Sequence, residues 1–282
     1  MSELSPFSRL RSPIIFDSGL SMDRQPLLVC QVGEFRKSYH ELRAGDAVVG
    51  TLPLHPGERF KLLDLADRGV TLFPPALAQF LNSSKITQAE ILREFMIPGT
   101  FVAYRLADLT DRLPEFSEFH PGPVVSKRDR AHLGLGVGRW DSLEALYSLA
   151  GLQSLPYPLV VQPFIEGARD FRVVIIGDYA EAYERVNPHG FRKNLFHGGF
   201  SRAAATDPSL LDFCHRVMAR GKFPYAILDL LVSPAGEPYL SEINLQGGLT
   251  GARLKQAEFR QKVAALTQEF CQAWENSSKN QP

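Results

Sequence analysis

Three side chains with hard oxygen donors lie close together near the C-terminal end of the sequence: Asp229, Glu242 and Asn244. Two carboxylates and an amide oxygen suit one or two Mg²⁺ ions, with Mn²⁺ as a substitute, that bridge the phosphates of a nucleotide. The alternative is a solvated outer face, which explains most carboxylates in strands. Leucines at positions 228, 230 and 231 surround Asp229 and favour the metal site.

A β-hairpin is expected to position these donors. Two runs rich in β-forming residues flank a turn-forming Ser-Pro-Ala-Gly sequence at 233–236. A four-residue loop would pair Glu242 with Ile227. Asp229 and Glu242 would then be diagonal neighbours on one face, with Cβ atoms roughly 7–8 Å apart. Asn244 shares this face because side chains alternate along a strand.

Composition limits the class of protein. At 282 residues the chain is long enough for two or three lobes. Lys plus Arg number 31, as do Asp plus Glu, so no overall basic charge recruits nucleic acid or an anionic membrane. The three cysteines are far apart in sequence and form no CxxC pair, which fits a reducing cytosol better than a disulfide scaffold. Because no signal peptide or membrane span is evident, we expect a cytoplasmic protein without nucleic-acid or membrane partners.

The N-terminal part of the sequence predicts a small α/β lobe. Apolar runs at 27–32, 47–52 and 70–73 are typical of strands, and 57–69 has the apolar spacing of a helix. Alternation of strand, helix and strand is characteristic of such lobes.

Two lysines mark the next part of the chain. A polar break at 82–84 starts a helix over 85–96, with Lys85 in its first turn. Further on, an apolar strand ends at Lys127 and continues into a loop with alternating glycines. Backbone N–H groups approach an anion where side chains are absent, and a lysine adds a charge, so this loop predicts a phosphate site. Most glycine-rich loops are simple turns, and that alternative stays open.

From residue 159 the chain reads as strands. An apolar run at 159–165 precedes a hairpin of 170–176 and 179–186 that carries Arg172 and Arg185 among apolar residues. The following loop, 187–202, is dense in Arg, Lys, Asn and Gly. Such loops close on triphosphates, although a solvated basic loop would look similar. The last elements expected are a helix at 207–221, a hairpin of 225–232 and 238–244, and a helix at 256–274.

In this order, these elements resemble the ATP-grasp superfamily, and within it the branch of bacterial glutathione synthetases and RimK-like glutamate ligases. The glycine loop there is close to KPxxGSxGxGV; residues 127–137 match its Lys, two of its Gly and its Val, but depart from it at Arg128, Ala131 and His132. The family patterns DxR, FRxNLxxGG and D…ExN are also met, and the match at 191–199 is the most specific. The resemblance covers about residues 82–254.

The resemblance implies an α/β (α+β) fold, the ATP-grasp fold, in which a small N-terminal α/β lobe is followed by two α+β lobes that clamp a nucleotide. The lobes would be residues 1–81, an N-terminal α/β lobe; 82–158, a central lobe with the glycine-rich loop; and 159–282, a C-terminal lobe with the metal site.

The resemblance also implies roles for individual residues. Nucleotide-binding positions are Lys85, Lys127, His132, Gly134, Gly136, Gln162, Pro163, Phe164, Ile165, Glu166 and Asp170. Of these, the two lysines would hold the α- and β-phosphates, the backbone of 162–165 the adenine edge, and Glu166 the ribose. Mg²⁺ ligands are Asp229, Glu242 and Asn244, and catalytic positions are Arg172, Arg185, Arg192 and Asn194.

The implied activity is ATP-dependent ligation of a carboxylate to an amine through an acyl phosphate, with release of ADP and phosphate. The substrates would be a small-molecule or peptide carboxylate and an amine acceptor. Homodimerisation is a further expectation that the resemblance carries. Two alternatives remain open: an ATP-binding regulatory module with impaired catalysis, which the departures in the glycine loop favour, and a kinase that uses the same phosphate site.

Overall fold

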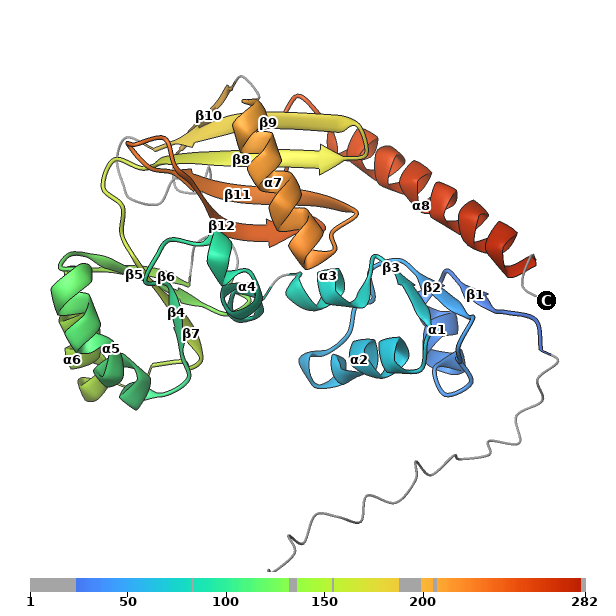
Figure 1. The fold of residues 1–282 in the computed structure, drawn as a ribbon, viewed down its shortest axis with the longest axis horizontal. Coiled ribbons are helices and arrows are strands. Elements are labelled where there is room, and N and C mark those ends of the chain that lie inside the picture. Colours follow the sequence, from blue (N-terminus) through green and yellow to red (C-terminus); the bar gives the residue numbers. More distant parts are fainter. Residues whose placement is uncertain are drawn as a thin grey trace, which may run out of the picture.

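Three β-sheets organise the chain. The computed structural model describes residues 24–82, 84–131, 136–153, 155–187, 199–204 and 207–279. In the first sheet the strand order is β1-β2-β3, in the second β4-β7-β5-β6, and in the third β10-β9-β8-β11-β12 (Figure 1). Clusters of buried apolar side chains lie at each sheet. No helix among the described residues is long and apolar enough to cross a membrane.

The first sheet is parallel and lies near the N-terminal end of the chain. Parallel strands joined by helices are what the α/β pattern of this part predicts. The predicted strand at 27–32 is wrong in its second half, because a helix already begins at Val32. The elements are β1 (Leu28–Val29), α1 (Val32–Ser38), β2 (Ala47–Val49), a 3₁₀ turn (Pro56–Glu58), α2 (Phe60–Asp67), β3 (Thr71–Phe73) and α3 (Ala76–Leu81).

The second sheet is antiparallel and includes a strand beyond the expected lobe boundary. β7 (Leu159–Pro163) lies between β4 and β5, so this sheet extends past residue 158. The predicted helix over 85–96 ends at Ile91 and continues as a 3₁₀ turn before Pro98. The other elements are α4 (Lys85–Ile91), the turn Arg93–Phe95, β4 (Phe101–Ala103), α5 (Leu106–Phe119), β5 (Val124–Arg128), β6 (Val137–Trp140) and α6 (Leu143–Leu152).

The third sheet is antiparallel, and its two long hairpins lie where the sequence predicts them. Figure 1 shows α7 lying across this sheet, and α8 leading from it towards the first sheet. There, Phe270 of α8 stacks on Phe73 with ring centroids 4.6 Å apart. The elements are β8 (Arg169–Ile176), β9 (Tyr179–Val186), β10 (Phe200–Ala203), α7 (Pro208–Gly221), β11 (Tyr225–Val232), β12 (Pro238–Asn244) and α8 (Gln256–Lys279).

The pairing of β11 with β12 differs from the predicted register. Asn244, not Glu242, lies opposite Ile227, and Asp229 lies directly opposite Glu242. The turn is tighter than predicted, because Ser233 and Glu237 already bond to each other (N–H to carbonyl, 2.9 Å). In addition, Asp229 pairs with Glu242 while Leu230 pairs with Leu240, so Ser241 is an extra residue on β12. This β-bulge turns Glu242 onto the face of Asp229 while Leu240 stays on the face of Leu230.

The outer edge of β12 is covered by a side chain from α4. Gln88 on α4 is fully buried, donates its amide to the Ile243 carbonyl at 2.7 Å, and accepts from the Ile243 N–H at 3.0 Å. It also donates to the Leu81 carbonyl at 2.9 Å. One amide side chain therefore ties α3 and α4 to the strand that carries Glu242.

We expect Gln88→Leu to lower the free energy of unfolding by about 2–4 kcal/mol, because buried donors and acceptors lose their partners at about 1–3 kcal/mol each. Urea denaturation measures this change. Glu90→Gln, at an exposed position of the same helix, serves as the matched control. A loss no larger than that of the control would contradict this account of the edge.

Candidate functional site

A row of four side chains crosses the third sheet. Tyr183 on β9 pairs with Arg172 on β8, Arg172 with Asp229 on β11, and Asp229 with Glu242 on β12. Side chains of directly paired residues lie on the same face of a sheet. Asn244 shares this face and donates its amide to Glu242 Oε1 at 3.0 Å. The three predicted oxygen donors therefore lie together.

Asp229 is held by two arginines. Arg172 donates Nε to Oδ1 at 2.6 Å and Nη2 to Oδ2 at 2.8 Å, and Arg185 Nη2 lies 3.2 Å from Oδ2. Burial would raise the pKa of Asp229, but the two guanidinium groups hold it well below its usual range. Burial would likewise lower the pKa of Arg172, yet the Asp229 carboxylate raises it. Asp229 is thus a largely buried, ionised carboxylate, with 15% of its side chain exposed and both oxygens in use.

Asp170 on β8 extends this network, since it pairs with Arg185 on β9, two residues along from the pair of Arg172 and Tyr183. Its Oδ1 accepts from Arg185 Nε at 2.7 Å and lies 2.6 Å from Nη2. Burial raises the pKa of Asp170 to about 6, although Arg185 opposes the shift. In this structure the Asp170 carboxylate orients Arg185, and its role in nucleotide binding stays a prediction.

Two lysines reach the row from α4 and β5. Lys85 Nζ lies 3.2 Å from Glu242 Oε2 and donates to the Ala131 carbonyl at 3.0 Å. Lys127 Nζ donates to Ser241 Oγ at 3.1 Å. Burial lowers the pKa of Lys127 to about 8, with Glu242 acting in the opposite direction. Four cationic side chains therefore surround two acidic ones and an amide, a setting suited to phosphate groups.

The glycine at position 136, at the base of the glycine-rich loop, is required by its close neighbours. Arg128 N–H donates to the Gly136 carbonyl at 2.8 Å and closes the base of the loop. A Cβ on Gly136 would lie 2.3 Å from the Ala131 Cβ, closer than any real contact. Position 136 thus admits only glycine.

Asp129 connects this loop to the start of α4. Its Oδ1 accepts from Ser84 Oγ at 3.1 Å and from the Ile86 N–H at 3.3 Å. Since Lys85 lies between these two residues, Asp129 fixes the helix end that carries it. Four predicted site residues lie outside the described residues: His132, Gly134, Arg192 and Asn194.

The predicted adenine-binding segment, Gln162, Pro163, Phe164 and Ile165, begins within β7 and then leaves the sheet. Phe164 N–H donates to the Pro123 carbonyl at 2.8 Å, and the Arg139 guanidinium lies over its ring at 4.5 Å. Arg139 also lies 3.7 Å from the Glu166 carboxylate, whose side chain is 86% exposed. These contacts define the segment's conformation, and the adenine and ribose roles stay predictions.

Residues 246–254, here called the strap, cross the face of the third sheet that carries the row. Arg172 Nη1 donates to the Gly248 carbonyl at 2.7 Å. A Cβ on Gly247 would lie 3.4 Å from Ile227, and one on Gly251 would lie 2.0 Å from Ser201 Oγ. Gly251 has φ +95, so both space and backbone conformation require glycine there. The strap therefore passes over β11, β8 and the edge at β10.

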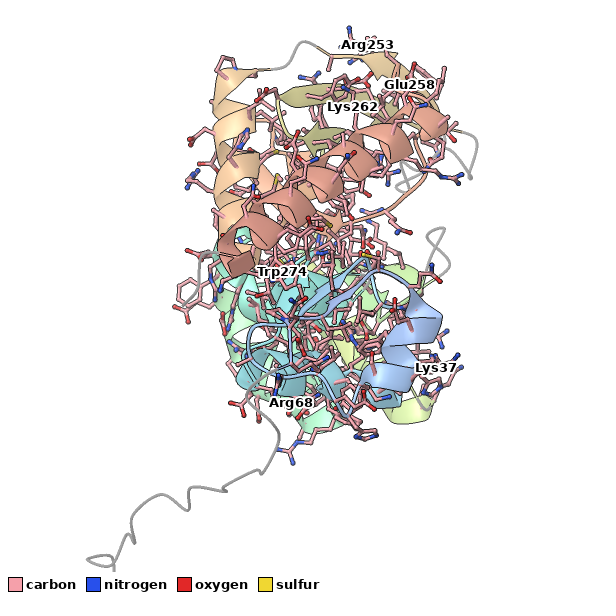
Figure 2. The ribbon with its side chains drawn as sticks, turned by 90° about the vertical axis from the view of Figure 1, so that its right-hand side faces the viewer. Lys37, Arg68, Arg253, Glu258, Lys262 and Trp274 are labelled. Atoms are coloured by element: carbon pink, nitrogen blue, oxygen red, sulfur yellow. The ribbon has the colours of Figure 1, made fainter. Side chains whose placement is uncertain are left out.

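Glu181 anchors the end of the strap. This buried carboxylate accepts from the Arg253 N–H at 2.7 Å, the Leu254 N–H at 3.2 Å and the Tyr179 hydroxyl at 2.8 Å. Burial would raise the pKa of Glu181, but these hydrogen bonds, led by that of Arg253, lower it. Figure 2 shows Arg253, Glu258 and Lys262 in sequence from the strap into α8, and these three residues line a groove of about 700 Å³.

Sequence reasoning missed three of these residues: Ser241, Asp129 and Glu181. Ser241 carries no signal in the sequence, because its role follows from the bulge. Glu181 does carry one, since it is an acidic residue in an apolar strand at the same alternation as Arg185. Its partner Arg253 is 72 positions away and could not be inferred.

The chemistry of the donors fits Mg²⁺. No group of three or more His, Cys, Asp or Glu side chains placed to hold a metal occurs in the part of the chain that the structure describes. The oxygen donors on the row include only two carboxylates, together with one amide. These are hard oxygen donors, and the cationic groups beside them would pair with phosphates that complete the coordination of the ion.

Comparison with known proteins gives structural matches only. The sequence matches no protein-family model and no curated protein. The structure is similar to D-alanine–D-alanine ligase from Bacillus anthracis complexed with ATP (TM-score 0.57, 17% identity, 85% of this chain and 84% of that one). It is also similar to D-cycloserine synthetase DcsG (TM-score 0.54, 16% identity, 78% of this chain and 84% of that one). A third match is the ATP-grasp ligase PsnB complexed with minimal precursor, Mg and ADP (TM-score 0.52, 18% identity, 79% of this chain and 78% of that one). At these identities the likeness shows the fold: the chain has the ATP-grasp fold.

We expect Glu181→Gln to loosen the strap, because an amide presents one acceptor oxygen instead of two to the Arg253 and Leu254 N–H groups. Amide hydrogen exchange of residues 245–254 should accelerate by at least about tenfold, the equivalent of one lost hydrogen bond. Glu184→Gln is the matched control, since Glu184 is buried on the same strand but bonds Arg169 and Arg202 on the other face. Equal exchange of the strap in both variants would contradict the anchoring role.

Proposed function

We propose that this protein is an ATP-dependent carboxylate–amine ligase. The observation that carries the proposal is the row on the third sheet: Asp229, Glu242 and Asn244 lie on one face, and four cationic side chains contact or adjoin them. Solved structures of the same fold that are described as ligases, one complexed with ATP and another with Mg and ADP, support this reading.

The roles proposed for the side chains are those that the family resemblance implies. Lys85 and Lys127 bind the α- and β-phosphates, and Arg172 and Arg185 face the phosphoryl group that is transferred, together with Arg192 and Asn194. Asp229, Glu242 and Asn244 hold Mg²⁺, which neutralises charge on the phosphates when bound.

In the reaction, a substrate carboxylate attacks the γ-phosphate of ATP, forming an acyl phosphate and releasing ADP. An amine then attacks the acyl carbon and expels phosphate. The chain supplies orientation and charge for both steps, because Arg172 and Arg185 are preorganised by Asp229 and Asp170 before substrates arrive. The strap covers the same face and restricts the access of water to the acyl phosphate.

The assignment to one branch of the superfamily rests on sequence motifs. The string at 191–199 and the spacing of Asp229, Glu242 and Asn244 support the branch of glutathione synthetases and RimK-like ligases. For the substrates we propose a small-molecule or peptide carboxylate and an amine, with Arg253 beside the groove as a contact for a substrate carboxylate. A cytoplasmic location and a homodimer complete the proposal.

One observation favours a second candidate, a nucleotide-binding module without turnover. Both oxygens of Asp229 are engaged by Arg172, so a metal must share or displace that contact. In such a module, the arginine pairing would persist when nucleotide binds. The experiment that follows separates the two candidates.

We expect phosphate release from Mg-ATP by the purified protein to require amino acids or small peptides, and to fall at least about a hundredfold in Asp229→Asn and in Arg185→Ala. Arg169→Ala is the matched control, because Arg169 lies on the same sheet but bonds Glu184 on the opposite face. Full activity in either site variant would refute the ligase. ATP binding that depends on Asp229, without release under any amino-acid or peptide pool, would favour the binding module.

We also expect the affinity for Mg-ATP to weaken above about pH 8. Burial places the pKa of Lys127 at about 8, so the free protein loses this charge as the pH rises. A bound phosphate favours the charged amine, so binding takes up a proton above that pH and becomes weaker, by at most about tenfold per pH unit. Calorimetric titration from pH 7 to 9.5 measures this dependence, and Lys127→Arg should remove it. A wild-type affinity that stays constant over the range would contradict it.

A further inference from the structure

One hydroxyl group on the row lacks a hydrogen-bond partner. Tyr183 on β9 is 1% exposed, and its hydroxyl oxygen is buried without a hydrogen bond to any residue that the structure describes. Folded proteins pair the large majority of their buried polar side chains, because an unpaired group has lost its bonds to water and gained nothing in return. A buried hydroxyl that is left unpaired beside a candidate site is therefore a candidate contact for a ligand.

Guanidinium groups lie on both sides of Tyr183. Tyr183 pairs directly with Arg172 on β8, and Arg185 lies two residues further along β9 on the same face. The nitrogens of Arg172 are directed elsewhere, since Nε and Nη2 donate to Asp229 and Nη1 donates to the Gly248 carbonyl. Burial raises the pKa of Tyr183, although Arg172 opposes this shift, so the hydroxyl keeps its proton at neutral pH. It is a neutral donor between two cations.

We propose that the Tyr183 hydroxyl donates a hydrogen bond to an oxygen of the phosphoryl group that is transferred from ATP. The inference rests on the proposed function, because it takes from there the position of this group beside Arg172 and Arg185. The hydroxyl gives up no proton in the reaction. It adds a neutral donor to the two charges, at the end of the row where the substrate carboxylate must approach the phosphorus.

The contact is specific for the terminal phosphate. Lys85 and Lys127 meet the row at β12, whereas Tyr183 lies on β9, three strands away in the sheet. At the usual spacing of strands, this distance is about 14 Å. The phosphates that the lysines bind are thus out of reach of the hydroxyl, and ADP does not make the contact.

The strap controls access to the hydroxyl. A Cβ on Gly251 would lie 3.5 Å from Cε2 of the Tyr183 ring, so the backbone of the strap lies against that ring. A phosphoryl group reaches the hydroxyl only when the strap rises at this point. Arg172 favours that movement when it turns towards the phosphate, because it then releases the Gly248 carbonyl that it holds in this structure.

The test is calorimetric titration of the full-length protein and of Tyr183→Phe with the magnesium complexes of ADP and of AMPPNP, a non-hydrolysable analogue of ATP. The affinity of the variant for AMPPNP should fall by about tenfold or more, the equivalent of one lost hydrogen bond to a charged group, while its affinity for ADP stays unchanged. Tyr157→Phe is the matched control. The Tyr157 hydroxyl is also buried without a partner in the described part of the chain, but it lies at the second sheet, so this variant should bind both nucleotides as the wild type does.

A second measurement needs no nucleotide. Because phenylalanine at position 183 removes only an unpaired hydroxyl, the urea midpoint of Tyr183→Phe without ligand should be no lower than that of the wild type. A lower midpoint would mean that the hydroxyl has a structural partner in the free protein, and it would overturn the proposal.

Two binding results would also overturn the proposal. One is an affinity of Tyr183→Phe for AMPPNP that equals that of the wild type. The other is an equal loss of affinity for AMPPNP and ADP, which would indicate a general disturbance of the nucleotide site. With a wild-type protein that binds both nucleotides, either result removes the Tyr183 contact and leaves the proposed function standing. A wild-type protein that binds neither nucleotide refutes the proposed function, and the contact with it.

Discussion

Charge compensation at Asp229 is the constraint on which the rest of the site depends. A largely buried carboxylate on an interior strand is stable only with partners, and here these are Arg172 and Arg185, the second of which also bonds Asp170. The arginines are in turn fixed from outside the sheet, since Arg172 donates to the strap at Gly248. Strand pairing, the strap and the acidic side chains are therefore parts of one network of ion pairs and hydrogen bonds. In the proposed function, such a network would meet a triphosphate with its cationic groups already in place, so little reorganisation would remain for the reaction itself.

Much of the hairpin and of the grouping of its oxygen donors could be predicted from the sequence. The β11–β12 hairpin has the bounds that the residues predict, because long β-forming runs lie between strong turn formers. The grouping of Asp229, Glu242 and Asn244 is also legible, since alternation is robust from 242 to 244. The pairing register could not be predicted, because the alternation of side chains does not reveal that Ser241 is an extra residue. A bulge between Leu240 and Glu242 moves every later side chain of β12 to the opposite face of the sheet. The helix at 32–38 was missed for a simpler reason: it follows a two-residue strand without a turn signal.

Contacts between distant parts of the chain were the least predictable. The contact of Glu181 with Arg253 and that of Gln88 with Ile243 each join segments that are brought together by the packing of sheets and helices rather than by local pattern. Each single residue has an ordinary alternative as a surface or core side chain. Only the fold distinguishes the buried carboxylate that receives two backbone N–H groups from one that faces water. The same applies to Asp129, whose bonds to Ser84 and Ile86 turn a loop residue into a support for Lys85.

The bonds between Gln88 and Ile243 also bear on the behaviour of the protein in concentrated solution. β12 is the last strand of its sheet, and a strand in that position can pair with another chain through its open N–H and carbonyl groups. The Gln88 amide imitates a neighbouring strand at Ile243, and Asn82 Oδ1 accepts the Leu245 N–H at 3.0 Å just beyond it. Side chains thus close the edge without completing the sheet. A chain in which α4 is displaced from β12 would present that edge to other molecules. Self-association of this protein should therefore begin at β12, the strand that carries two of its three proposed metal ligands.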